Sequence, residues 1–243
     1  MAQAKPTLVL VPGLMCDAHA WADVPSGLPE FDCHVVDHGH VDSLVHMAEQ
    51  LLAHAPARFA LAGHSMGGRV ALEVMRIAPE RVTHLGLFDT GHLPKAAGAA
   101  GEEEVRKRMA LLAIAREQSV RAMAAEWVKG MVAPQRLGDT ALIESILTMF
   151  ERKSADIFER QLRALINRPD ATSVLQAVQV PTLVLCGEHD AWSPPAQHQA
   201  MADCVAHRPT LVAVPEAGHM VMQEQPQAVQ RAMRAWLALE ASC

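Results

Sequence analysis

Short β-branched runs alternate with segments of helical periodicity along most of the chain. Between the runs, apolar side chains recur at i, i+3, i+4 and i+7, for example over 44–52 and 229–237, which is the spacing of an amphipathic helix. This alternation predicts an α/β fold, a mostly parallel sheet with helices on both faces. We expect about six strands, at Thr7–Val11, Cys33–Asp37, Arg58–Ala62, Val82–Phe88, Pro181–Cys186 and Thr210–Val214.

The segment 93–177 interrupts the alternation, because it shows helical periodicity and no strand pattern. We expect four helices in it, after a Pro-, Gly- and Ala-rich linker at 94–101, over 102–117, 119–131, 139–152 and 155–167. The sequence therefore predicts a core made of 1–92 and 178–243, with a helical lid, 93–177, inserted between two strands. The lid carries 13 Lys and Arg against 11 Asp and Glu, a small excess that an ordinary solvated surface explains better than an anionic substrate.

Composition excludes several classes of protein. Half of the 243 residues are apolar and 20% are charged, the balance of a chain that buries a sizeable core and is neither disordered nor fibrous. No apolar run is long enough to span a membrane, and the first apolar stretch is too short for a signal peptide. A net charge of −6 argues against nucleic acid as a partner. Five cysteines without a C-x-x-C pair indicate reduced thiols, and hence a cytoplasmic location.

A serine flanked by glycines stands between a predicted strand and a helical run. The segment 63–67 reads Gly-His-Ser-Met-Gly, the G-x-S-x-G pattern of a nucleophile elbow in its strand–turn–helix context. Glycines let the strand and the helix pass closely, and the start of a helix favours negative charge on the serine oxygen. We therefore predict Ser65 as a nucleophile and expect His64 to pack beneath the turn.

A serine nucleophile needs a base, and the base needs a carboxylate that orients it. Asp190 follows the fifth predicted strand in a loop that begins with glycine, and His219 follows the sixth. The order Ser65, Asp190, His219 is that of α/β-hydrolase triads, and all three lie where parallel strands end. Asp89, at the end of the fourth predicted strand, is the competing acid. The pattern favours Asp190.

Backbone and pocket residues complete the predicted site. An oxyanion hole takes one N–H from the residue after the serine, here Met66, and one from an earlier loop, for which Leu14 is the natural candidate. A flexible apolar pocket for an acyl or alkyl group would use methionine and tryptophan side chains, although core residues would look the same in the sequence. The pocket candidates are Met15, Arg69, Trp192 and Met220.

Three motifs together carry a resemblance to a known family. The segments GHSMGG at 63–68, GEHDAWSP at 187–194 and PEAGHM at 215–220 resemble those of the α/β-hydrolase superfamily, serine esterase type, and the resemblance covers nearly the whole chain. The helical lid predicted for this chain resembles that of pimeloyl-acyl-carrier-protein methyl ester esterases and related small carboxylesterases. Pro12 stands where many relatives have histidine, and the chain starts at what would be the family's third strand.

The resemblance implies a serine esterase that cleaves a small-molecule carboxylic ester, a thioester or a lactone, through an acyl-enzyme on Ser65. Nothing in the sequence asks for a metal or an organic cofactor. The polar segment 37–42, with histidines at 38 and 40, is expected to form a turn rather than a metal site.

Other functions stay open. The run Ser-Met-Gly-Gly-Arg at 65–69 resembles that of the menaquinone-pathway lyase, in which the arginine helps to hold an anionic substrate. A lyase or a carbon–carbon bond hydrolase acting on an anionic substrate is therefore an alternative. Because His64 replaces that family's usual tyrosine, we expect Arg69 to be an exposed residue of its helix. A cofactor-free perhydrolase and a non-catalytic binding protein are further alternatives, and the oligomeric state is not indicated.

Overall fold

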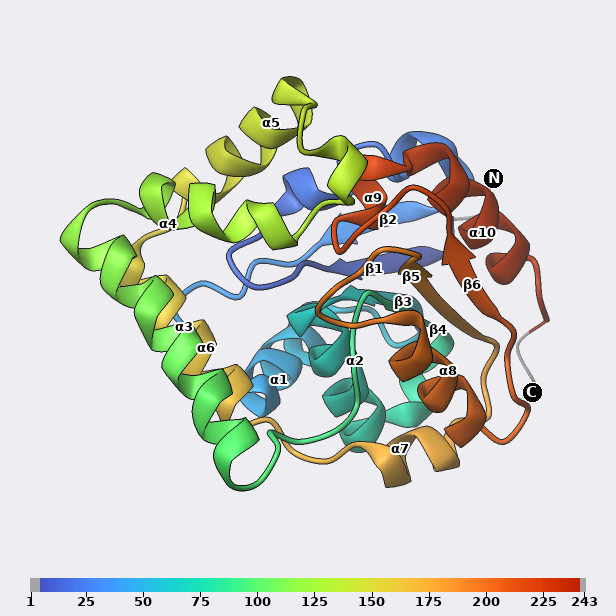
Figure 1. Cartoon of the computed structure of the whole chain (residues 1–243). Coiled ribbons are helices and arrows are strands. Elements are labelled where there is room, and N and C mark those ends of the chain that lie inside the picture. The colour runs from blue at the N-terminus through green and yellow to red at the C-terminus, as the bar shows by residue number, and fades with distance from the viewer. Residues whose placement is uncertain (1–4, 241–243) are drawn as a thin grey trace.

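The computed structural model describes residues 5–240. Its centre is a six-stranded sheet in which all paired strands are parallel, in the order β2-β1-β3-β4-β5-β6 (Figure 1). The predicted α/β architecture is confirmed. The first and fourth strands have the predicted bounds and the others shift by one or two residues, as follows: β1 (Thr7–Val11), β2 (Asp32–Val35), β3 (Phe59–His64), β4 (Val82–Phe88), β5 (Thr182–Gly187) and β6 (Leu211–Val214).

The strand order changes direction at β1. The chain runs from β1 outward to the edge strand β2 and then returns to the other side of β1 to form β3. The carboxyl ends of β1 and β3 lie side by side, since Val11 pairs with Gly63. In open parallel sheets such a reversal leaves a crevice at the strand ends, where ligands bind.

Helices cover both faces of the sheet (Figure 1). On one face lie α1 (Leu44–His54), α2 (Met66–Ile77), α7 (Thr172–Ala177) and α8 (Pro195–Cys204), and on the other α9 (Val221–Glu224) and α10 (Pro226–Leu237). The predicted apolar stripes are the buried ones, since α1 buries Leu44 and Met47 whereas α10 buries Met233 and Trp236. Short 3₁₀ turns occur at Ala18–Trp21, Pro25–Gly27, Pro79–Arg81, Val128–Gly130 and Pro134–Arg136.

Four helices between β4 and β5 stand to one side of the sheet (Figure 1). Side chains at the N-cap position start three of them, because Ser119, Asp139 and Ser154 each accept a hydrogen bond from the backbone N–H three residues on. The four helices are α3 (Ala99–Glu117), α4 (Val120–Trp127), α5 (Thr140–Glu151) and α6 (Ala155–Ile166). We keep the name lid for 93–177, and its status as a separate unit remains an interpretation.

Three differences from the sequence prediction concern this region. The helix predicted over 119–131 ends at Trp127, and the 3₁₀ turn Val128–Gly130 follows it. The helix α3 starts three residues before the predicted position, after Gly98, whose φ of +63° lets the chain turn into the helix. The six-residue helix α7 was not predicted, since it is too short to show helical periodicity.

No helix in the stretch 5–240 is long and apolar enough to cross a membrane. Cys16, Cys33, Cys186 and Cys204 are free thiols, and Cys243 falls outside the described residues.

Candidate active site

Ser65 occupies the sharp turn between β3 and α2. Its φ of +53° is strained for a residue with a side chain. Two hydrogen bonds to the end of β4 hold it, because the Ser65 N–H donates to the carbonyl of Phe88 and Thr90 Oγ1 donates to the carbonyl of Ser65. A side chain at Gly67 would overlap the carbonyl of Val11. The glycine therefore lets α2 start directly against β1.

The side chains of Ser65, His219 and Asp190 form a continuous hydrogen-bonded chain. The Ser65 hydroxyl lies 2.8 Å from His219 Nε2, and His219 Nδ1 lies 2.8 Å from Asp190 Oδ2. The other Asp190 oxygen accepts the N–H groups of Trp192 and Ser193, at 2.9 Å each. Burial favours the neutral acid, but His219 and these two N–H donors outweigh it and lower the pKa of Asp190. Asp190 is therefore ionised beside the imidazole.

Asp89 does not hydrogen-bond His219. It is fully buried, and its Oδ1 accepts the N–H of Gly187 at 2.8 Å, which fastens the end of β5 to the end of β4. Burial, and then the negative charge of Asp190, raise the pKa of Asp89 well above its usual value. Asp190 contacts His219 Nδ1 whereas Asp89 binds the backbone of Gly187, so the geometry favours Asp190 over Asp89 as the orienting acid.

The turn after β1 holds the first candidate donor for an oxyanion hole. The N–H of Met15 donates to Gln161 Oε1 at 2.8 Å, and that of Cys16 donates to the carbonyl of Gly13. Leu14 immediately precedes these two residues, and its N–H meets no acceptor within residues 5–240. Met66 is the first residue of α2, so its N–H has no intrahelical acceptor either. These are the two donors that the sequence predicts for an oxyanion hole.

A cavity of about 510 Å³ opens above Ser65 and His219. Three of the four predicted pocket residues line it, namely Arg69, Trp192 and Met220. The prediction for Met15 is wrong, because its side chain is enclosed in the core and is not part of the cavity wall. Sequence reasoning missed most of the wall, which the lid supplies through Arg108, Leu111, Trp127, Met131, Phe158, Leu162, Leu165 and Arg168.

One side of the cavity is aromatic. Trp192, in the loop that carries Asp190, stacks on Trp127 at the end of α4, with ring centroids 5.3 Å apart. The same indole lies 4.8 Å from the His219 ring. Trp127 in turn contacts Phe150 and Phe158 of the lid. The aromatic group thus connects the interior of the lid to the His219 imidazole.

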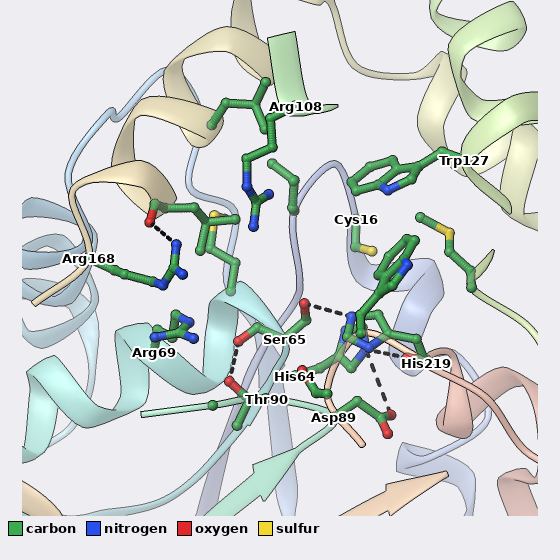
Figure 2. Close-up of a pocket in the computed structure, with 18 of the residues that line it drawn as sticks. Cys16, His64, Ser65, Arg69, Asp89, Thr90, Arg108, Trp127, Arg168 and His219 are labelled. Atoms are coloured by element: carbon green, nitrogen blue, oxygen red, sulfur yellow. Dashed lines mark hydrogen bonds and ion pairs between the residues drawn. The ribbon is translucent and has the colours of Figure 1, made fainter. Parts of the chain in front are cut away.

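The opposite side of the cavity is cationic. Figure 2 shows Arg69, Arg108 and Arg168 gathered on one side of Ser65, with Trp127 and His219 on the other. Arg168 forms two hydrogen bonds with the carboxylate of Glu104, and Arg108 forms a third. The guanidinium groups of Arg108 and Arg168 therefore share one carboxylate, that of Glu104.

The expectation that Arg69 is exposed is wrong. The lid covers this face of α2, so the guanidinium lies in the cavity wall, where it donates to the backbone carbonyl of Leu93 at 2.9 Å. No carboxylate in the described part of the chain pairs with it. Burial, and then the charges of Arg168 and Arg108, lower the pKa of Arg69 to about 9. Because this pKa lies above neutral pH, Arg69 stays charged without an ionic partner.

The polar segment 37–42 forms a turn in which Gly39 has a φ of +51°. His38 is buried there, and burial lowers its pKa to about 4. Over residues 5–240, no three His, Cys, Asp or Glu side chains are grouped so that they could hold a metal ion.

Comparisons with known proteins find relatives over most of this chain. The carbamate hydrolase named RutD of Pseudomonas syringae is 30% identical over 256 residues, which cover 97% of this chain and 95% of that protein. A pimeloyl-[acyl-carrier protein] methyl ester esterase of Nitrosomonas europaea is 26% identical over 227 residues, 88% of each chain. A dihydrolipoyllysine-residue acetyltransferase component of the acetoin cleaving system of Pseudomonas putida is 30% identical over 82% of this chain. The match spans 51% of the length of that acetyltransferase component.

A solved structure shows the same fold with a related sequence. The thermophilic esterase of Thermogutta terrifontis, solved with malate bound, superposes with a TM-score of 0.83 at 27% identity, over 97% of this chain and 90% of that one. The model of the alpha/beta hydrolase family matches residues 8–232. The resemblance inferred from the three motifs is thereby confirmed. The chain belongs to the alpha/beta hydrolase family, a family of hydrolases with esterases among its members.

Proposed function

We propose that this protein is a serine hydrolase that cleaves a carboxylic ester through an acyl-enzyme on Ser65. The observation that carries the proposal is the hydrogen-bonded chain from Ser65 Oγ through His219 to Asp190. His219 Nε2 takes the hydroxyl proton as Oγ attacks the ester carbonyl. Asp190 holds the proton on Nδ1, which keeps Nε2 free as the acceptor, and stabilises the imidazolium that forms.

The backbone N–H groups of Leu14 and Met66 would stabilise the tetrahedral intermediate. Neither donor has an acceptor within residues 5–240, and Met66 is the first residue of α2, where the helix dipole adds partial positive charge. The His219 imidazolium then gives its proton to the leaving alcohol. Water, activated by the same imidazole, releases the acid and restores Ser65. Each proton transfer uses a side chain of the protein itself. The same steps would cleave a thioester or a lactone.

A second candidate is supported by Arg69. A charged guanidinium in the cavity wall without a carboxylate partner is costly unless a ligand supplies the counter-charge. A substrate that carries a carboxylate would supply it, and the related thermophilic esterase was solved with a dicarboxylate, malate. The second candidate is therefore the same triad acting on an anionic substrate, either as an esterase or as a lyase or carbon–carbon bond hydrolase.

The decisive experiment compares Ser65→Ala with Ser193→Ala. Ser193 also lines the cavity but contributes only its backbone N–H to Asp190. Wild type and Ser193→Ala should hydrolyse p-nitrophenyl esters and become labelled by a fluorophosphonate, whereas Ser65→Ala should do neither. His219→Ala should lose at least about 10²-fold in turnover, since it removes the general base. Turnover or labelling of Ser65→Ala above about a tenth of the wild-type level would refute the proposal.

A further inference from the structure

Glu224 is a buried carboxylate that the proposed chemistry does not use. It ends α9, five residues after His219, and its side chain takes part in no ion pair within residues 5–240. Its Oε1 accepts the N–H of Gly218 at 2.8 Å and that of Met220 at 3.3 Å. One carboxylate oxygen thus holds the backbone on both sides of His219.

The other oxygen of Glu224 binds the lid. Oε2 accepts the N–H of Ala133 at 2.8 Å, and Ala133 lies between the last 3₁₀ turns of the lid before α5. The backbone of His219 makes its own contact with the same segment, because its N–H donates to the carbonyl of Met131 at 2.6 Å. The fit is tight, since a Cβ on Gly218 would lie 2.6 Å from that carbonyl oxygen.

We infer that Glu224 is a positioning residue that clamps the histidine loop to the lid segment 131–133, so that alignment of His219 depends on the lid being in place. The inference rests on the proposed function. Burial raises the pKa of Glu224, whereas the three backbone N–H groups that donate to it oppose this shift and satisfy the buried carboxyl group. Because these donors come from two segments, the carboxylate fixes the distance between them.

A small shift of the histidine loop would disturb the triad at both ends. His219 must keep 2.8 Å contacts with Ser65 and with Asp190 at the same time, and a misplacement of about 1 Å can cost roughly 10²-fold in rate. The clamp therefore acts on turnover rather than on substrate binding, because Glu224 does not line the cavity.

Glu224→Gln tests the clamp with nearly unchanged shape. An amide has one acceptor oxygen, so it satisfies either the His219 side or the lid side and turns an NH₂ group toward the N–H of the other. We expect kcat for a p-nitrophenyl ester to fall by roughly 10- to 100-fold, with KM within threefold of wild type. Ser119→Ala is the matched control, because the Ser119 hydroxyl caps lid helix α4 and takes no part in the hydrogen bonds of Glu224. The control should keep kcat within twofold of wild type.

Tryptophan fluorescence reports the lid side of the clamp. Trp127 and Trp192 stack across the boundary between the lid and the core, whereas Trp21 and Trp236 are buried elsewhere. Glu224→Gln should increase quenching by acrylamide, and Ser119→Ala should not. A kcat of Glu224→Gln within twofold of wild type would overturn the inference, as would an equal loss in Ser119→Ala.

Hydrogen exchange of the wild-type protein tests the clamp without any variant. The amides of 131–133 and 218–220 should lose protection together, with the same opening free energy, because one carboxylate holds both segments. Protection of 218–220 that persists while 131–133 exchanges would overturn the inference. If Ser65→Ala is inactive and Glu224→Gln is fully active, the clamp fails and the proposed function stands.

Discussion

His64 Nε2 donates a hydrogen bond to the backbone carbonyl of His219 over 2.7 Å, so the residue before the proposed nucleophile holds the residue proposed as its base. His64 is almost fully buried, and its Nδ1 finds no partner in the described part of the chain. Burial, and then the charge of His219, lower the pKa of His64 to about 3. His64 is therefore a neutral structural support beneath the turn, as the sequence predicts.

This burial makes the stability of the protein depend on pH. Unfolded, His64 binds a proton near pH 6.5, but in the folded protein it stays neutral until about pH 3. Between these values the unfolded state holds more protons, so the free energy of unfolding falls as the pH decreases from about 6.5. The loss is at most about 1.4 kcal/mol per pH unit for one histidine, and His38 adds a second contribution.

Urea unfolding between pH 4.5 and 7.5 would measure this dependence. The variant His64→Gln cannot take up a proton, so its stability should change less steeply with pH than that of wild type. His46→Gln is the control, because His46 is an exposed residue of α1 and should leave the slope unchanged. Equal slopes for His64→Gln and wild type would show that His64 is not the group that titrates on unfolding.

The choice between Asp190 and Asp89 can be tested by substituting each with asparagine. Asp190→Asn should lower turnover by about 10⁴-fold, the scale seen when the histidine tautomer is no longer fixed. Asp89→Asn should leave kcat within a few-fold of wild type, because Asp89 hydrogen-bonds Gly187 and not His219. Steady-state hydrolysis of a p-nitrophenyl ester measures both. The opposite result would assign the acid to the end of β4.

Part of the site could be predicted from the sequence because local features encode it. Ser65 is marked by two glycines that its turn requires, and Asp190 and His219 each follow an apolar strand by a few residues. Their meeting then depends only on parallel strands ending at one edge of the sheet. The strand bounds were predictable for the same reason, because each strand is a short apolar run.

The cavity wall could not be predicted, because it depends on which faces of the lid helices turn toward the core. Helical spacing shows that α3 and α6 exist but not that Arg108 and Arg168 project toward Ser65. The prediction that Arg69 is exposed fails for the same reason, since it is the lid that encloses this face of α2. The clamp of Glu224 was also hidden, because its lid partners are backbone groups, which carry no residue-specific signal.

In the second candidate function, Arg69 would favour a substrate that carries a carboxylate. Arg69→Ala should lower kcat/KM for the p-nitrophenyl half ester of glutaric acid and leave p-nitrophenyl pentanoate, which has the same chain length without the carboxylate, within a few-fold of wild type. A charge-assisted hydrogen bond is worth roughly 1.5–3 kcal/mol, which corresponds to a loss of about 10- to 150-fold on the charged ester. Arg116→Ala is the control, because Arg116 pairs with Glu159 outside the cavity. Equal effects of Arg69→Ala on the two esters would exclude a carboxylate subsite and leave the neutral ester as the favoured substrate.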